Sequence, residues 1–203
     1  TQIKIAFFSA LPPFRGGISS FSRLLVNALK GKSLIEAFTF KKQYPNFLFP
    51  GESQFSKNSD SSFPRIITSY NPLTYFKAGH KLKQTKPDVF VVNYWMPFFA
   101  PMYVFLASRF SNSVLKVALI HNLVPHEERF FDRFFNRMFL KSFDTFVVLS
   151  EKVNQDLLSY RPDATSKVIS HPTYAQFGAK KDFQVAREYF NIEKEAKVLL
   201  FFG

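Results

Sequence analysis

The sequence predicts an α/β fold, a Rossmann-like doubly wound parallel sheet with helices on both faces. Short apolar runs rich in β-branched residues alternate along the chain with segments whose apolar residues recur at helical spacing. The apolar runs are continuous, which is typical of strands buried on both faces of a parallel sheet. With 46% hydrophobic and 21% charged residues, the chain has the composition of a protein with a packed core.

The first third of the chain predicts two strands around one helix. A strand is expected over residues 3–9, and a loop with two adjacent glycines follows it. Residues 18–30 carry apolar side chains at helical spacing, and residues 36–40 have the pattern of a second strand. Between residues 46 and 64, serine, asparagine, glycine and proline predominate, which indicates a long surface loop.

The rest of the chain continues the alternation of helix and strand. Asn71 and Pro72 are a favourable N-cap and first-turn residue for a helix that reaches residue 86, and Ser150 is a favourable N-cap for another. Strands are expected over residues 89–92, 115–120, 145–149 and 167–170, and further helices over 101–110, 129–142 and 151–159. Residues 89–108 are uncharged and long enough to cross a bilayer, but Asn93 and two prolines interrupt them, so a strand and a helix are expected instead.

The pattern changes near the C-terminal end of the chain. Residues 1–172 are expected to form one Rossmann-like domain. Residues 173–203 are expected to be an interdomain linker with a charged helix over 180–190, followed by the first strand, 197–203, of a second domain that is absent from the chain. No signal peptide is expected, because the apolar run at the start is short and contains Lys4.

Charge and cysteine content limit the classes of site. The formal net charge is +12, and the chain contains no cysteine. A basic surface attracts phosphates, anionic lipid headgroups or nucleic acid, although a basic solvated face has the same charge. The absence of cysteine excludes disulfides, zinc–thiolate sites and thiol nucleophiles.

Candidate functional residues follow the ends of the predicted strands, where open parallel sheets bind ligands. Gly16 and Gly17 precede a helix whose free N–H groups and positive dipole end favour an anion. The loop lacks the third glycine of a dinucleotide fingerprint and the lysine of a Walker A loop. A plain glycine-rich turn is the alternative interpretation.

A second group of candidates follows the strand expected over residues 115–120. His121 and Asn122 end this strand, and His126 and Glu127 follow closely. Two histidines and a carboxylate at one strand end indicate a site, whereas a single histidine is more often a packed residue. A metal is not expected, because the chain has no His-x-x-x-His pair on a helix.

The helix expected over residues 129–142 has two contrasting faces. Its apolar residues form a wide stripe, consisting of Phe130, Phe131, Phe134, Phe135, Met138 and Phe139. Arg129, Arg133 and Arg137 lie three or four residues apart on the other side. The stripe is expected to pack on the sheet, since every helix of such a fold needs an apolar face, and a helix lying on a membrane surface is the alternative.

In order and spacing, these motifs resemble those of the bacterial family 4 retaining glycosyltransferases, which have the GT-B fold. The resemblance covers essentially the whole chain and rests on residues 13–18, 86–89, 121–122, 143–151 and 198–203. Residues 41–45, 48–51 and 121–127 are similar to one bacterial branch of the family. The resemblance implies that the chain is the N-terminal, acceptor-side half of a GT-B fold.

The resemblance also implies an activity for the full-length protein, which would be a hexosyltransferase. It would move a sugar from a nucleotide-diphosphate sugar to an acceptor hydroxyl with retained anomeric configuration, without a metal or cofactor. Gly16, Gly17 and Asn122 would bind the donor. His121 would be catalytic, with its backbone carbonyl facing the positive charge that develops at the anomeric carbon. Most of the donor site would belong to the absent second domain, so this chain alone would be inactive.

The expected partners follow from the same resemblance and from the charge. The acceptor-side candidates are Arg15, Tyr94, Trp95, His126 and Glu127. The expected partners are a nucleotide sugar, a carbohydrate or lipid-linked acceptor of polysaccharide biosynthesis, and an anionic membrane surface, with no nucleic acid. The protein is expected in the cytoplasm, including a peripheral position at the inner face of the membrane.

Two other function classes were weighed against the sequence. An NAD-type Rossmann enzyme or epimerase is disfavoured, because the third glycine is missing and no acidic residue ends the second strand. A basic nucleic-acid or membrane-binding module would explain the net charge. It would not explain why the glycine pair and His121 both fall at strand ends.

Overall fold

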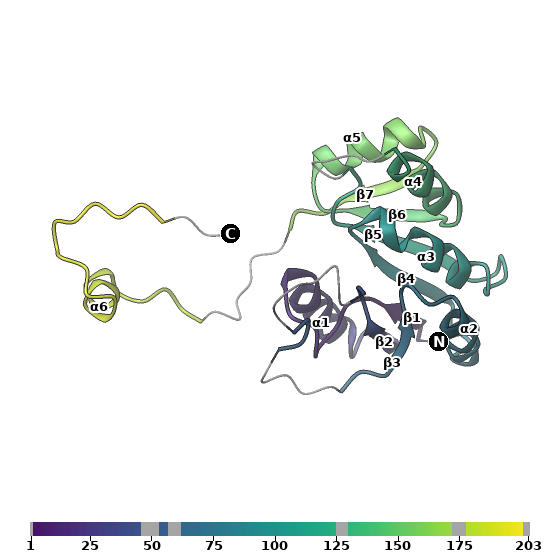
Figure 1. The fold of residues 1–203 in the computed structure, drawn as a ribbon, viewed down its shortest axis with the longest axis horizontal. Coiled ribbons are helices and arrows are strands. Elements are labelled where there is room, and N and C mark those ends of the chain that lie inside the picture. Colours follow the sequence, from purple (N-terminus) through teal and green to yellow (C-terminus); the bar gives the residue numbers. More distant parts are fainter. Residues whose placement is uncertain (1, 46–52, 57–61, 125–129, 172–177, 201–203) are drawn as a thin grey trace. The chain divides into compact units, whose positions relative to one another are not determined.

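The computed structural model describes residues 2–45, 53–56, 62–124, 130–171 and 178–200. The chain divides into two compact units, Thr1–Ser170 and His171–Gly203. The first unit holds a sheet of seven parallel strands in the order β3-β2-β1-β4-β5-β6-β7 (Figure 1). The predicted Rossmann-like α/β fold is therefore confirmed.

The strands agree with the sequence pattern except at the β3 edge of the sheet. They are β1 (Lys4–Phe8), β2 (Leu34–Lys42), β3 (Arg65–Thr68), β4 (Val89–Tyr94), β5 (Leu115–Ile120), β6 (Thr145–Val148) and β7 (Thr165–Val168). The sequence analysis missed β3, which has four residues and buries Ile66 and Ile67. A run this short has no periodicity of its own, and its pairing with β2 defines it.

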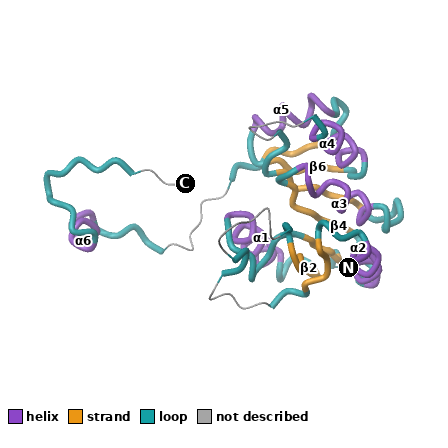
Figure 2. Tube along the Cα trace, in the orientation of Figure 1, coloured by secondary structure: helices purple, strands orange, loops and turns teal. Residues whose placement is uncertain are grey.

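Helices cover both faces of the sheet, as Figures 1 and 2 show. The helices of the first unit are α1 (Gly17–Leu29), α2 (Leu73–Gln84), η2 (Pro97–Phe99), α3 (Ala100–Ala107), α4 (Asp132–Lys141) and α5 (Glu151–Tyr160). Helix α1 lies on one face, while α2, α3 and α4 lie side by side on the other. Neighbouring β1 residues divide between these layers, since Phe7 packs with Val26 of α1 and Phe8 faces the larger core opposite.

The predicted N-cap is present at α5, whereas at α2 Pro72 is the N-cap and Asn71 precedes it. The Ser150 hydroxyl accepts the Val153 N–H at 3.3 Å, which confirms the N-cap of α5. The Asn71 side chain accepts the Leu73 N–H at 3.1 Å at the start of α2. Helix α2 ends before Lys86, which has a left-handed φ of 46° and precedes a proline.

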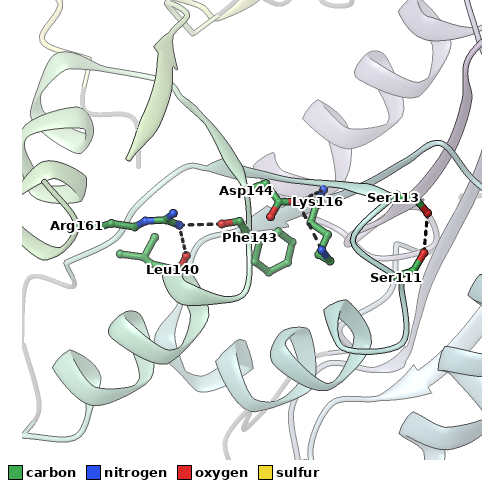
Figure 3. A network of polar contacts seen from close by, with 7 residues as sticks. All are labelled: Ser111, Ser113, Lys116, Leu140, Phe143, Asp144 and Arg161. Carbon is green, nitrogen blue, oxygen red and sulfur yellow. Dashed lines mark hydrogen bonds and ion pairs between the residues drawn. The ribbon is translucent and has the colours of Figure 1, made fainter. Parts of the chain in front are cut away.

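Two motif aspartates connect neighbouring strands at the amino edge of the sheet. The Asp88 carboxylate accepts the Lys4 N–H at 2.8 Å. Likewise, the Asp144 carboxylate accepts the Lys116 N–H at 2.8 Å, the pair that Figure 3 shows. In each pair the aspartate N–H donates back to the carbonyl of the same lysine at 2.9 Å. These aspartates therefore extend the pairing of β1 with β4 and of β5 with β6, and fix the strand register.

One arginine connects the end of α4 to the end of α5. The Arg161 Nη1 donates to the carbonyls of Leu140 and Phe143, each at 2.8 Å (Figure 3). Its guanidinium also lies 5.6 Å from the centroid of the Phe146 ring. A planar guanidinium suits this place, because it donates in fixed directions while it stacks on an aromatic face.

The predicted packing of α4 is half right. Of the apolar stripe, Phe135, Met138 and Phe139 pack on the core, whereas Phe130, Phe131 and Phe134 are exposed. The helix also buries Asp132 and Asn136, and Asn136 is fully enclosed. Its amide accepts from the Tyr94 hydroxyl at 2.6 Å and donates to the Leu123 carbonyl at 2.7 Å. This bridge sets the rotation of α4, because a buried amide needs partners while a phenylalanine tolerates solvent.

The second unit contains one helix, α6 (Phe183–Tyr189), in its described part. The Asp182 carboxylate caps it by accepting the Gln184 and Val185 N–H groups. Residues 197–200 do not form the strand expected there, and residues 201–203 lie outside the described residues. A strand forms by pairing, and residues 178–200 contain no strand that could pair with it. The assignment of 173–203 to a linker and the start of a second domain stays a prediction.

The uncharged segment 89–108 folds as a strand followed by short helices. Strand β4 ends at Tyr94, and the following helices η2 and α3 end at Ala107. No helix in the described part of the chain has the length and apolar character needed to cross a membrane.

Candidate active site

The sheet order places the candidate site at one edge. Strands β1 and β4 are neighbours, with β2 and β3 on one side of them and β5 to β7 on the other. The winding therefore reverses between β1 and β4, and ligands of open α/β sheets bind outside the carboxyl ends of the strands at such a point. The loops after β1, β4 and β5 border this place and carry Gly16, Trp95 and His121.

The two glycines at the start of α1, Gly16 and Gly17, occupy different backbone conformations. Gly16 has φ 110° and ψ 170°, a region that glycine alone occupies readily, so the backbone itself requires it. Gly17 has no left-handed φ, and no heavy atom of the described residues lies within 4 Å of the place where its Cβ would be. The fold therefore does not explain Gly17. Open space over both residues leaves the backbone accessible to a ligand.

The first turn of α1 is suited to an anion. Among the described residues, no side chain caps its N–H groups, and its first turn contains no acidic residue. An open cavity of about 580 Å³ borders this turn. Its lining includes two arginines, four serines and a glycine: Arg15, Arg23, Ser19, Ser20, Ser56, Ser62 and Gly16. Guanidinium, hydroxyl and backbone N–H donors together favour a negatively charged ligand.

The structure brings His121 against the same helix. His121 directly follows β5, and its N–H donates to the Tyr94 carbonyl at 2.8 Å. Its half-buried ring meets the ring of Phe21 edge to face, with centroids 4.8 Å apart. Since Phe21 lies in α1, the strand end that carries His121 packs on the helix that begins at the glycine pair.

A buried hydrogen-bond chain fixes α1 on the sheet, and the sequence analysis did not identify it. The Ser22 hydroxyl donates to the Ile18 carbonyl at 2.7 Å, so it can only accept from its other two partners. These are the Asn93 amide and the Ser9 hydroxyl, each at 2.8 Å. Ser9 follows β1 and Asn93 lies near the end of β4, so the chain joins the strands of the switch point to α1. A polar residue inside the apolar run of β4 was the one indication of it in the sequence.

Two predicted acceptor-side residues, Tyr94 and Trp95, have different environments. Tyr94 is fully buried, and its ring stacks on Phe139 with centroids 3.8 Å apart. Burial, with the charges of Asp132 and Tyr160, raises the pKa of Tyr94 well above its usual value. Its assignment to the acceptor side is therefore corrected to a place in the core. Trp95, which follows the end of β4, packs against the same core but is only partly buried.

Trp95 belongs to an aromatic group that the sequence analysis had not assembled. Its half-buried indole N–H donates to the Tyr44 hydroxyl at 3.4 Å. The Tyr44 ring stacks with Phe98 at a centroid distance of 6.2 Å. Burial raises the pKa of Tyr44, which the hydrogen bond from Trp95 lowers in part. A neutral phenol beside an indole offers flat apolar surface with polar edges at the site.

The remaining candidates divide between described and undescribed residues. Asn122 is half-buried next to His121, and Arg15 is exposed beside the glycine pair, with its N–H donating to the Gln54 carbonyl at 3.1 Å. His126 and Glu127 lie outside the described residues. Within the described ranges, no group of three or more histidine or carboxylate side chains could hold a metal ion.

A second cavity lies at the opposite edge of the sheet. It has a volume of about 290 Å³ and is lined at the amino ends of β1 and β2 by residues such as Lys4, Leu34 and Glu36. Ligands of doubly wound sheets bind at the carboxyl edge. The cavity beside Gly16 is therefore the better candidate site.

Comparison with protein families gives one match. The sequence profile of Glycosyltransferase Family 4 matches residues 49–173, which is more than half of the chain. This range includes β3 to β7 and His121. No curated protein sequence is significantly similar to the chain.

Several solved structures have a similar fold. An alpha-glucosyltransferase, solved in complex with UDP and a 13-mer DNA containing a central A:G mismatch, has 16% identity and a TM-score of 0.51. The match covers 81% of this chain and 39% of the alpha-glucosyltransferase chain. UDP-N-acetylglucosamine 2-epimerase from Rickettsia bellii has 10% identity and a TM-score of 0.52. That match covers 82% of this chain and 44% of the epimerase chain. A sucrose-phosphate synthase from Thermosynechococcus elongatus has 16% identity and a TM-score of 0.48, and the match covers 92% of this chain and 99% of the solved chain. At these identities, similarity extends to the fold alone.

Proposed function

Because the chain belongs to glycosyltransferase family 4 and has the fold of a GT-B N-terminal domain, we propose a specific reaction for the full-length protein. It transfers a hexose from a nucleotide-diphosphate sugar to an acceptor hydroxyl, with retention of the anomeric configuration. The chain spans 39% and 44% of two similar solved chains. Activity therefore belongs to the full-length protein, in which a second domain completes the donor site, and this chain alone is inactive.

One observation supports this assignment more than any other. The Phe21 ring connects His121 to α1, and α1 begins at Gly17. A site for sugar transfer needs an anion-binding element for the leaving diphosphate next to a group that faces the reacting carbon. The contact between Phe21 and His121 supports the proposal, because it joins the segments that would carry these two elements at one edge of the sheet.

The proposed role of the glycine pair is to receive the donor diphosphate. Gly17 has no side chain that would keep an oxygen atom away from the backbone, and the fold gives no other reason for a glycine there. The free N–H groups of the first turn of α1 donate to the phosphate oxygens. As the sugar bond breaks, negative charge grows on the diphosphate, and the helix N-terminus stabilises it.

The proposed role of His121 is electrostatic and positional. Its carbonyl faces the anomeric carbon, which gains positive charge as the leaving group departs. Its ring, held by Phe21, contacts the donor sugar, and Asn122 adds a donor contact beside it. The reaction uses no metal or cofactor in this proposal.

The acceptor approaches from the loops after β1 and β4. Arg15 and Trp95 lie on this side, and His126 and Glu127 complete it in the proposal. The acceptor is a carbohydrate or a lipid-linked sugar of polysaccharide biosynthesis. The protein acts in the cytoplasm, at the inner face of the membrane. Nucleic acid is not a partner.

The experiment compares His121→Ala with His80→Ala in the full-length protein. His80 is an exposed histidine of α2, so its replacement controls for loss of an imidazole away from the site. His121→Ala should lower kcat/KM for transfer by at least about 100-fold, while both variants unfold like the wild type. NMR of the product should show the anomeric configuration of the donor. An inverted product would exclude retention, and wild-type kcat/KM in His121→Ala would exclude the assigned role.

A further inference from the structure

The exposed aromatic residues of the first unit gather at one edge of the fold. Over the described part of Thr1–Ser170, five phenylalanines are exposed, and all lie at the starts of α2, η2 and α4. They are Phe76 (61% exposed), Phe98 (37%), Phe130 (100%), Phe131 (45%) and Phe134 (65%), here called the aromatic rim. In a parallel sheet, each crossover helix begins where a strand ends, so the aromatic rim lies at the carboxyl edge, which also holds the candidate site.

The helices behind the aromatic rim carry charge of one sign. Helix α3 lies between α2 and α4, so the three form one continuous layer (Figure 1). Their exposed charged side chains are all basic in the described residues: Lys77, Lys81, Lys83, Arg133, Arg137 and Lys141. The one carboxylate in this layer is Asp132, which is buried. Among the described residues of these helices, the exposed charge is therefore entirely positive.

The outward position of the phenylalanines on α4 follows from the fold. The fully buried Asn136 bridges Tyr94 and Leu123, and this rotation leaves Phe134 exposed on another side of the helix. Phe130 is fully exposed in the turn before α4. The ring of Phe134 contacts the half-buried Phe135 at 5.8 Å, so the exposed rings continue an aromatic cluster. Apolar patches of this kind on a folded surface mark sites of interaction.

We propose that the aromatic rim and the cations of α2 and α4 dock the protein on an anionic membrane surface. Phenylalanine rings insert between headgroups, while lysine and arginine side chains meet anionic lipid phosphates. Charge complementarity favours a membrane over a protein partner, because lysines are depleted in protein interfaces. Docking through the outer face of this layer brings the carboxyl edge beside the lipid surface, so a lipid-linked acceptor reaches the site from the membrane. That last consequence rests on the proposed function, and the docking does not.

The experiment is sedimentation of the 203-residue chain with vesicles. Phosphatidylcholine vesicles with and without phosphatidylglycerol should differ, with binding to the anionic vesicles alone and loss of binding in high salt. The double variant Arg137→Gln/Lys141→Gln should bind about 30-fold more weakly, since each basic residue near the surface contributes about 1 kcal/mol. Its control, Lys30→Gln/Lys32→Gln, removes two exposed charges outside α2 to α4 and should bind like the wild type.

A second pair of variants tests the apolar contact. Phe130→Ser/Phe134→Ser should weaken binding by about tenfold or more. Leu34→Ser/Leu115→Ser replaces two exposed leucines at the amino edge (51% and 44% exposed) and should leave binding unchanged. All four side chains are exposed, so melting temperatures near that of the wild type are expected for both variants.

Equal binding to both vesicle types, or equal loss in test and control variants, would overturn the proposal. So would self-association in ultracentrifugation that the phenylalanine variant abolishes, because it would assign the rim to a second copy of the chain. Unchanged transfer to a soluble acceptor would separate failure of docking from failure of the proposed reaction.

Discussion

Replacement of Gly17 by alanine should stabilise the protein and weaken its donor binding at the same time. Gly17 is the first residue of α1, has no left-handed φ, and has open space where a Cβ would lie. Alanine loses less conformational entropy on folding than glycine, which stabilises by about 0.4–1 kcal/mol where the backbone is compatible. The same methyl group would stand in the path of a diphosphate, and a loss of about 1.4 kcal/mol corresponds to tenfold weaker donor binding.

The matched control is Gly16→Ala. Gly16 has φ 110° and ψ 170°, so alanine there should destabilise by about 1–3 kcal/mol. Urea unfolding of the 203-residue chain, followed by circular dichroism, measures both stability changes. Donor KM in the full-length protein measures the functional effect. A destabilised Gly17→Ala variant would refute the structural reasoning, and an unchanged donor KM would refute the proposed contact with the diphosphate.

Three further predictions concern stability. Asn136→Leu should lower the free energy of unfolding in urea by about 2–4 kcal/mol, because the buried Tyr94 hydroxyl and the Leu123 carbonyl lose their partner. A loss below about 0.5 kcal/mol would contradict this. Asp144→Ala should lower the free energy of unfolding by about 1–2 kcal/mol, because the Lys116 N–H between β5 and β6 loses its acceptor. Its control, Asp163→Ala, removes a side chain that is 80% exposed and should cost less than about 0.5 kcal/mol. Equal effects of the two replacements would argue against the role of Asp144 in the strand register. Burial raises the pKa values of Tyr94 and Tyr103 well above 10.0, so the stability from their neutral forms is complete below that pH and is lost as the pH rises above it. Tyr103→Phe should reduce this alkaline slope in urea unfolding, and an identical slope would contradict the pKa shift.

The central strands and the cap at Ser150 could be predicted from local pattern, because a continuous apolar run or an N-cap is decided by neighbouring residues. The rotation of α4 could not. Hydrophobic periodicity selected the whole phenylalanine stripe as the buried face, but only its C-terminal half packs on the core. The partners of Asn136, which come from β4 and the turn after β5, place Asn136 on that face as well. The same bridge took Tyr94 into the core. Such contacts join residues far apart in the sequence and leave no periodic pattern.

The sequence allowed a prediction of the edge of the sheet that holds the candidate site, but not of all the residues that form it. Open parallel sheets bind ligands at the carboxyl ends of their strands, and the strand order brings Gly16 and His121 to that edge. The contact of His121 with Phe21 and the chain from Ser22 to Asn93 required the three-dimensional packing of α1 on the sheet. Phe21 and Ser22 belong to the ordinary buried face of an amphipathic helix, so the sequence contained nothing that distinguished them from core residues.

Amide chemical shifts of the isotope-labelled 203-residue chain, titrated with nucleotide-diphosphate sugars, test the location of the donor site most directly. Weak binding is expected, because one wall of the site supplies few of the charge-assisted hydrogen bonds that hold a diphosphate. The shifts should concentrate at Gly16, Gly17, His121 and Asn122 on the carboxyl edge. Shifts concentrated at Lys4 and its neighbours around the amino-edge cavity would contradict the assignment of the site.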